Sequence, residues 1–222
     1  MGFSYALGWR FFRLLFATYF RWTVLDPDNV PRAGAVILAS NHASFLDPPL
    51  VGAGLPRHVS FLARDSLFDS FPLGAILRSW RVVPVDRDGG TGRGLREILG
   101  RLDEGGAILL FPEGTRSPDG QLQPARAGVG LAVIKSTAPV VPVRVFGSFA
   151  ALGRKSNFPR PHPLVVKYGH PMSFTALRSE AKTCSRPRLK EIYQEAAGQI
   201  MLSINQLNPA PEDKSSENPR GE

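Results

Sequence analysis

Short apolar runs alternate with helical patterns along most of this 222-residue chain, and this alternation constrains the fold more than any other feature. The predicted strands are residues 35–40, 59–63, 81–85, 107–111, 140–146 and 164–169. The predicted helices or helical turns between them are residues 48–55, 70–80, 92–105 and 127–137. Buried strands that alternate with helices are typical of an α/β fold. We therefore predict a mixed, largely parallel sheet flanked by helices, in one domain that spans residues 26–207.

The N-terminal stretch FSYALGWRFFRLLFATYFRWTVL is rich in aromatic side chains and contains Arg10, Arg13 and Arg21. These arginines interrupt the apolar run before it reaches the ~20 residues that a membrane span needs. On a helical wheel they fall within an arc of roughly 80°. We predict that residues 1–25 form an amphipathic helix that lies in the membrane interface. The alternative is a helix that covers the protein's own core.

The chain is basic, with 27 Lys and Arg residues against 19 Asp and Glu and a formal net charge of +8. Such a charge favours a nucleic acid, an anionic membrane surface or a phosphorylated substrate as partner. The basic residues are scattered and no nucleic-acid-binding motif is present, so we expect an anionic membrane surface and no nucleic acid. Histidines and carboxylates do not cluster at metal-ligand spacings, and Cys184 is the only cysteine. We therefore predict no metal and no cofactor.

The last residues, 208–222, contain almost no apolar side chains and are predicted to form a disordered tail. Residues 147–163 show no periodicity and are predicted to form an ordered loop between two strands. From residue 173 to 207 the pattern is helical, with a break near Pro187.

His42 and Asp47 lie in the sequence ASNHASFLDP, directly after the predicted strand 35–40. Asp47 can accept a hydrogen bond from one imidazole nitrogen and leave the other nitrogen to take a proton, which would make His42 a general base. No serine in a nucleophile-elbow sequence accompanies the pair, so a substrate hydroxyl would be the attacking group. The alternative is structural: Asp47 before a proline is a good N-cap, and His42 would then bind a buried carbonyl.

A second polar segment, FPEGTRSPDG, follows the predicted strand 107–111 and should reach the same edge of the sheet as His42. In this glycine-containing turn, an arginine fork can be aimed at a phosphate. Arg87 supplies another cation at the end of the predicted strand 81–85. The alternative is a surface turn with an ordinary ion pair. The candidate site residues of the turn are Glu113, Gly114, Thr115 and Arg116.

Four blocks, NHASFLD, VVPVDR, FPEGTRS and VVPV, occur in the order and approximate spacing seen in the glycerolipid acyltransferase family. The chain resembles that family from about residue 25 to residue 175. The resemblance implies direct transfer of a fatty acyl group from acyl-CoA or acyl-carrier protein to the sn-2 hydroxyl of 1-acylglycerol-3-phosphate (lysophosphatidic acid). The product would be phosphatidic acid for phospholipid biosynthesis. From the N-terminal helix, the basic charge and the single cysteine, we also expect a peripheral or monotopic protein of the cytoplasmic membrane, with its active site facing the cytoplasm.

The resemblance also assigns roles to individual residues. His42 would be the base and Asp47 its orienting partner, with oxyanion donors expected among the backbone N–H groups near this loop. Arg87 and the turn residues 113–116 would hold the glycerol phosphate of the acceptor, and Pro142 would form part of the wall of the acyl or acceptor site. Two alternatives stay open: an acyltransferase for another lysolipid acceptor, and a non-catalytic basic peripheral membrane protein.

Overall fold

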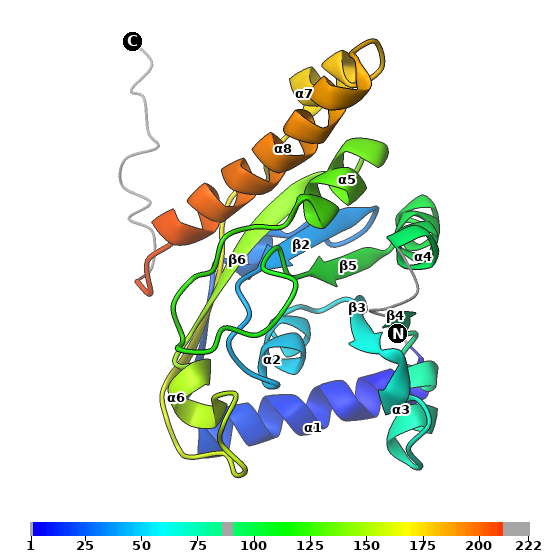
Figure 1. Cartoon of the computed structure of the whole chain (residues 1–222). Helices are drawn as coiled ribbons and strands as arrows, with labels where there is room; N and C mark the ends of the chain where they lie inside the picture. The colour runs from blue at the N-terminus through cyan, green and yellow to red at the C-terminus, as the bar shows by residue number, and fades with distance from the viewer. Residues whose placement is uncertain (1, 86–90, 211–222) are drawn as a thin grey trace, which may run out of the picture.

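A computed structural model describes residues 2–85 and 91–210 of the chain (Figure 1). In these residues, seven strands form one sheet in the order β1-β7-β6-β2-β5-β3-β4. Five neighbouring strands run in the same direction, whereas β1 and β7 are parallel to each other and antiparallel to β6. The predicted mixed, largely parallel sheet is therefore confirmed. The strands are β1 (Trp22–Leu25), β2 (Val36–Ser40), β3 (Val59–Arg64), β4 (Val83–Val85), β5 (Ala107–Leu110), β6 (Val140–Phe146) and β7 (Leu164–Tyr168).

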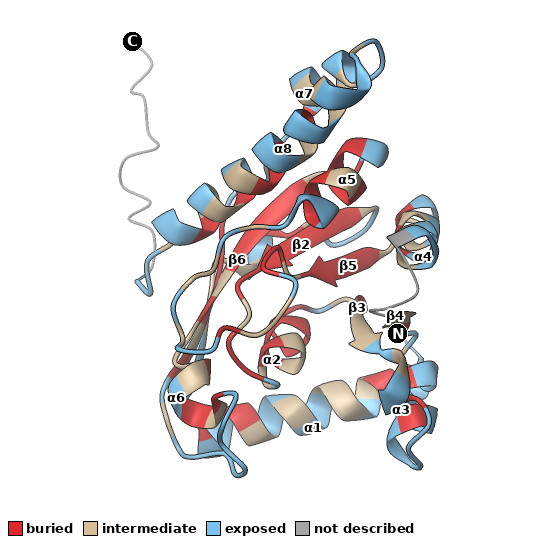
Figure 2. Cartoon of the chain, viewed as in Figure 1, coloured by how far each residue is buried: buried red, intermediate tan, exposed pale blue. Residues whose placement is uncertain are grey.

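Helices cover both faces of this sheet (Figure 1). They are α1 (Phe3–Tyr19), α2 (Asp47–Ala53), α3 (Leu73–Ser79), α4 (Thr91–Asp103), α5 (Ala127–Lys135), α6 (Ser148–Leu152), α7 (Thr175–Glu180) and α8 (Arg186–Gln206). Because successive side chains of a strand point to opposite faces, β2 feeds two cores. Val36 and Leu38 pack with α1 and α2, while Ile37 and Ala39 pack with α4, α5 and α8. Burial on both faces is the reason that the central strands read as continuous apolar runs; these strands appear buried in Figure 2.

The N-terminal helix α1 packs against the first of these cores. Phe16 and the adjoining Phe20 are fully buried, and Arg13 donates a hydrogen bond from Nη1 to the carbonyl oxygen of Ala53 at 2.9 Å. One face of α1 therefore covers the protein's own core, as the alternative interpretation of this segment expected. Its other face leaves large apolar side chains exposed, namely Phe3, Leu7, Phe11 and Leu14. No helix among the described residues is long and apolar enough to cross a bilayer.

Several element boundaries differ from those predicted. The N-terminal helix ends at Tyr19 rather than at residue 25, and residues 22–25 form strand β1. The predicted loop 147–163 begins with the short helix α6. The predicted break in the C-terminal helical region falls just before Pro187, which lies in the first turn of α8, and Ser185 caps that helix. Most of the predicted tail, residues 211–222, lies outside the described residues.

Three parallel strands at the centre of the sheet, β6, β2 and β5, are direct neighbours. Parallel strands end at the same edge of a sheet, and loops at that edge form the sites of open α/β folds. The segments that follow β2 and β5 are those that contain His42 and Glu113.

Candidate active site

His42 and Asp47 form a hydrogen-bonded pair just beyond the end of β2. His42 Nδ1 lies 2.9 Å from Asp47 Oδ2, the Asp47 side chain is fully buried and the imidazole is 17% exposed. Because an ionised carboxylate only accepts hydrogen bonds, Nδ1 is the donor and Nε2 is left to accept a proton. This is the geometry of an oriented general base.

The structural alternatives for this pair do not match the structure. The N-cap of α2 is Leu46, with no side-chain cap hydrogen bond, and Asp47 is the first helical residue. Its carboxylate turns back to the preceding loop, where Oδ2 accepts the N–H groups of Ala43 and Ser44, each at 2.7 Å. Three donors therefore fix one carboxylate oxygen, and His42 contacts this carboxylate instead of a buried carbonyl.

Most backbone N–H groups of the segment 42–47 are engaged within the protein. Ala43 and Ser44 donate to Asp47, and His42 donates to Glu113 at 2.9 Å. Leu46 and Asp47 donate to the hydroxyl and the carbonyl of Ser44. These five N–H groups are thus not available to an oxyanion. If backbone N–H groups near His42 stabilise an oxyanion, as expected from the sequence, they must be others than these five.

Glu113 holds the segment that contains His42. Its carboxylate accepts the N–H of His42 through Oε1 and the N–H of Gln123 through Oε2, and the residue is only 2% exposed. Burial raises the pKa of Glu113 to about 7, the two N–H donors oppose this shift, and the negative charge of Asp47 adds to it. With both oxygens engaged, Glu113 positions His42, and the expected contact with the acceptor phosphate does not fit this geometry.

Two further contacts hold His42, one at its backbone and one at its imidazole. The carbonyl of His42 accepts a hydrogen bond from the N–H of Ser117 at 2.7 Å, so that both backbone polar groups of His42 are bound by the segment after β5. The imidazole stacks on the ring of Phe111, with 3.9 Å between centroids and an interplanar angle of 16°. The two polar segments predicted to meet at one edge of the sheet do meet there.

Gly114 turns the chain between Glu113 and the residues that reach the cavity. Its φ of +69° lies in the left-handed region that favours glycine, and a Cβ at this position would lie 2.8 Å from Cδ of Arg126. The turn directs Thr115 and Arg116 toward the cavity.

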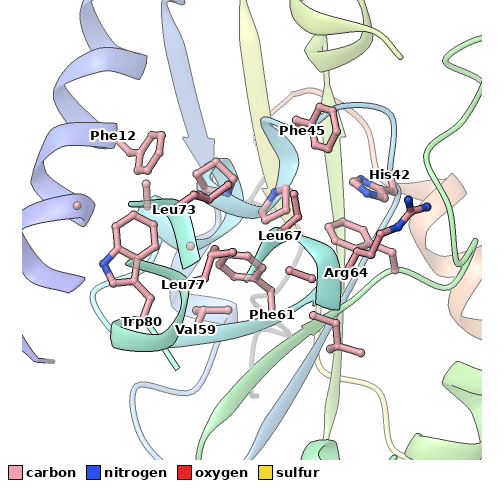
Figure 3. Close-up of a pocket in the computed structure, with 18 of the residues that line it drawn as sticks. Phe12, His42, Phe45, Val59, Phe61, Arg64, Leu67, Leu73, Leu77 and Trp80 are labelled. Carbon is pink, nitrogen blue, oxygen red and sulfur yellow. The ribbon is translucent and has the colours of Figure 1, made fainter. Parts of the chain in front are cut away.

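A cavity of about 700 Å³ opens beside His42. Figure 3 shows His42, Phe45 and Arg64 at one end of it, and Phe12 and Trp80 at the other. Between these ends the walls are mostly aliphatic and aromatic side chains, including Val59, Phe61, Leu67, Leu73 and Leu77. Helix α1 contributes part of the wall through Tyr5, Gly8, Trp9 and Phe12.

Of the arginines that the structure describes, three line the cavity: Arg64, Arg116 and Arg154. Only Arg116 was singled out from the sequence. Arg64 ends β3, a parallel neighbour of β5, so its position at a strand end was a signal that could have found it. Arg154 follows α6 in a segment without periodicity, and no sequence signal marks it.

Pro142, another predicted site residue, lies elsewhere. Pro142 is buried in β6, accepts a hydrogen bond from the N–H of Gly169 at 2.8 Å, and does not line this cavity. Arg87 lies outside the described residues. The structure thus brings together His42, Asp47, Thr115 and Arg116. Glu113 binds the backbone of His42, and Gly114 makes the turn that leads to Thr115 and Arg116.

A sequence model of the family described as Acyltransferase matches residues 21–146, which include both polar segments of the site. The chain belongs to this acyltransferase family. It is 27% identical over 125 residues to the 1-acyl-sn-glycerol-3-phosphate acyltransferase of Bacillus subtilis, covering 56% of this chain and 62% of the relative. It is 29% identical over 150 residues to the human 1-acyl-sn-glycerol-3-phosphate acyltransferase beta, covering 65% of this chain and 53% of the relative.

The chain aligns with only part of the length of the curated relatives. The aligned region spans 62%, 38% and 53% of the first three of them. The structural similarity covers more of the chain than these sequence alignments do. The crystal structure of the 1-acyl-sn-glycerophosphate acyltransferase of Thermotoga maritima superposes with a TM-score of 0.68 at 24% identity, over 92% of this chain and 79% of that one. This likeness shows the shared fold.

Proposed function

We propose that this acyltransferase moves a fatty acyl group from acyl-CoA or acyl-carrier protein to the sn-2 hydroxyl of 1-acylglycerol-3-phosphate, giving phosphatidic acid for phospholipid biosynthesis. The observation that carries the proposal is the location of the His42–Asp47 pair at one end of an apolar cavity that arginines also line. The apolar walls suit an acyl chain, the guanidinium groups suit a phosphate, and the base suits a hydroxyl nucleophile.

In the proposed reaction His42 Nε2 removes the proton of the acceptor hydroxyl as its oxygen forms a bond to the thioester carbonyl carbon. The tetrahedral intermediate then collapses, and the carbon–sulfur bond breaks. The departing sulfur receives the proton held by His42, so that the base is regenerated and a free thiol leaves. Asp47 stabilises the imidazolium that exists between these two steps, because its Oδ2 lies 2.9 Å from Nδ1.

The arginines would hold the acceptor. Arg64, Arg116 and Arg154 line the same cavity as His42. A phosphate bound by them would place a hydroxyl of the same glycerol near the proposed base. Such positioning lowers the barrier by removing the entropy cost of bringing the reactants together. Further support comes from the names of the curated relatives, at 27% to 29% identity for those cited above.

We also propose that the protein binds peripherally to the cytoplasmic membrane, with its site facing the cytoplasm. The support is the exposed face of α1, where Phe3, Leu7, Phe11 and Leu14 recur at helical spacing. Each is at least 60% exposed, with Phe3 at 87%. Apolar side chains of this size on one helix face are typical of helices that lie in the membrane interface.

The test is an acyl-transfer assay with purified protein, mixed acyl-CoA and acyl-carrier-protein donors, and mixed acceptors. Thiol release should depend on added lysolipid, and the product mass should be that of phosphatidic acid. A 1-acylglycerol without phosphate should be a poor acceptor, whereas equal use of it would reject the assignment of the arginines. The His42→Ala variant is the matched control. Thiol release without an acceptor would indicate thioester hydrolysis and would contradict the proposal. No thiol release and no transfer to any lysolipid would also contradict it and would favour a non-catalytic membrane protein.

A product formed only from lysophosphatidylcholine or from an ornithine-type lysolipid would support acyl transfer as the reaction but would contradict 1-acylglycerol-3-phosphate as the acceptor. Loading the two donors with acyl chains of different length lets the product mass decide which thioester carrier the protein accepts.

A further inference from the structure

The loop that joins α6 to β7, residues 153–163, carries an exposed aromatic ring among cationic side chains. Phe158 is 80% exposed, and Arg154, Lys155 and Arg160 are exposed beside it. The loop has defined backbone contacts, because the N–H of Arg160 donates to the carbonyl of Ala151 at 2.8 Å and Ser156 donates to Gly153 at 3.0 Å. Its exposed ring therefore belongs to a structured segment.

This α6–β7 loop lies beside the end of α1. The hydroxyl of Tyr19 donates to the carbonyl of Pro159 at 3.2 Å, across 140 residues of sequence. Figure 1 shows α1, this loop and the segment that leads into α3 along the same side of the molecule. The α3 segment adds further exposed apolar side chains, with Phe71 at 89% and Leu73 and Ile76 at 40% each.

We propose that the α6–β7 loop is a second contact with an anionic lipid surface, in addition to α1. In this arrangement Phe158 enters the boundary between headgroups and acyl chains, and Lys155 and Arg160 bind the lipid phosphates. The inference rests on the membrane association proposed above and extends it to a segment that has no helical pattern. Arg154, in the same loop, also lines the cavity, so the loop connects the lipid surface to the site.

An acidic carrier protein is another partner that a basic loop could bind. The exposed Phe158 and the position of the loop next to the exposed apolar face of α1 favour lipid, because both features match an apolar boundary that carries anionic headgroups. Binding of the carrier protein is therefore an outcome that the test distinguishes.

The first measurement is site-specific labelling, which is simple here because Cys184 is the only cysteine to be replaced. In a Cys184→Ser background, Phe158→Cys carries an environment-sensitive fluorophore, and the matched control is Leu202→Cys on α8, where the native side chain is 63% exposed. Vesicles of phosphatidylcholine with phosphatidylglycerol should shift the emission of the label at 158 to the blue and leave the label at 202 unchanged. No shift at 158, or an equal shift at both positions, would overturn the proposal. A shift at 158 with acyl-carrier protein but not with vesicles would also overturn it.

The second measurement tests the charges. The Lys155→Gln/Arg160→Gln double variant should bind these vesicles roughly 25-fold more weakly, at about fivefold for each cation near an anionic surface. The control is Lys182→Gln/Lys190→Gln, which removes the same charge near α7 and the start of α8, far from α1 in Figure 1. Equal weakening in the two double variants would mean that only net charge matters and would overturn the loop contact.

Acyl transfer to a short-chain, water-soluble acceptor separates this inference from the proposed function. Normal transfer without any response at position 158 rejects the loop contact alone. A response at 158 in a protein that transfers no acyl group supports the loop contact and rejects the proposed reaction.

Discussion

The guanidinium carbon of Arg116 lies 3.5 Å from the centre of the Phe45 ring. Phe45 belongs to the short segment between His42 and Asp47, and its side chain is large and 61% exposed. A cation over an aromatic face is attracted by the ring's electrons. The segment that contains His42 therefore also provides the ring against which Arg116 lies, the residue proposed to bind the acceptor phosphate.

Phe45→Leu should raise the acceptor KM about threefold to tenfold, the usual worth of one cation–π contact, and leave the donor KM unchanged. Phe45→Tyr should retain wild-type kinetics because the aromatic face is kept. Arg116→Ala should raise the acceptor KM further, since a charge-assisted phosphate contact is lost. In the Arg116→Ala background, Phe45→Leu should have no additional effect. Full additivity of the two substitutions would show that the ring does not act through Arg116.

His42→Ala should lower kcat by ~10²–10⁴-fold, the usual contribution of a positioned general base. The fold should persist because the imidazole lies at a loop beyond β2 and is partly exposed. Circular dichroism and thermal unfolding provide the control for folding. Turnover close to wild type would exclude His42 as the base.

Asp47→Asn should lower kcat at least tenfold, because an amide no longer stabilises the imidazolium as a carboxylate does. It should also lower the free energy of unfolding by about 1–3 kcal/mol, since the buried carboxylate accepts two N–H groups as well as the imidazole. Stopped-flow kinetics and denaturant unfolding measure the two effects. Loss of stability with full activity would restrict Asp47 to a structural role.

Glu113 should make stability depend on pH. Its folded-state pKa of about 7 is above the ordinary value of 4.5, so the folded protein binds more protons than the unfolded chain between these values. Stability should therefore fall as pH rises from about 4.5 to 7, by on the order of 3 kcal/mol from this group. In Glu113→Gln that component should disappear, and denaturant titrations of both proteins at several pH values would show it. Parallel stability curves for the two proteins would contradict the raised pKa.

The two faces of α1 should respond differently to substitution. Phe16→Ala should cost about 3–5 kcal/mol of stability, because the ring is fully buried in the core. Leu7→Gln with Phe11→Gln should leave thermal unfolding nearly unchanged and weaken sedimentation with anionic vesicles. The reverse pattern, with unfolding by the exposed pair, would show that this face packs within the protein.

The main sheet was predictable because its central strands are buried on both faces and read as uninterrupted apolar runs. Strand β1 was missed because Trp22–Leu25 continue the aromatic stretch of α1 and become a strand only through pairing with β7, where Trp22 is opposite Leu164. This pairing joins residues far apart in sequence, which no local pattern can encode.

Within the site, the two polar segments were predictable from their positions at the ends of parallel strands. The direction of each side chain was not. Glu113 was expected to face the acceptor, yet the left-handed turn at Gly114 sends it toward the backbone of His42 and sends Arg116 toward the cavity. Arg154 reaches the cavity from a segment whose position depends on the packing of α6, and sequence pattern alone could not place it there.

The backbone of His42 is bound on both sides by residues more than seventy positions further along the chain, Glu113 and Ser117. The active geometry thus depends on contacts that close a long loop, and such contacts form slowly in folding. When the denatured protein is returned to native conditions, helical circular dichroism should recover first, and acyl transfer should return only with the slower phase in which β2 and β5 pair. The rate at which enzymatic activity returns would then report the rate of the last long-range step of refolding.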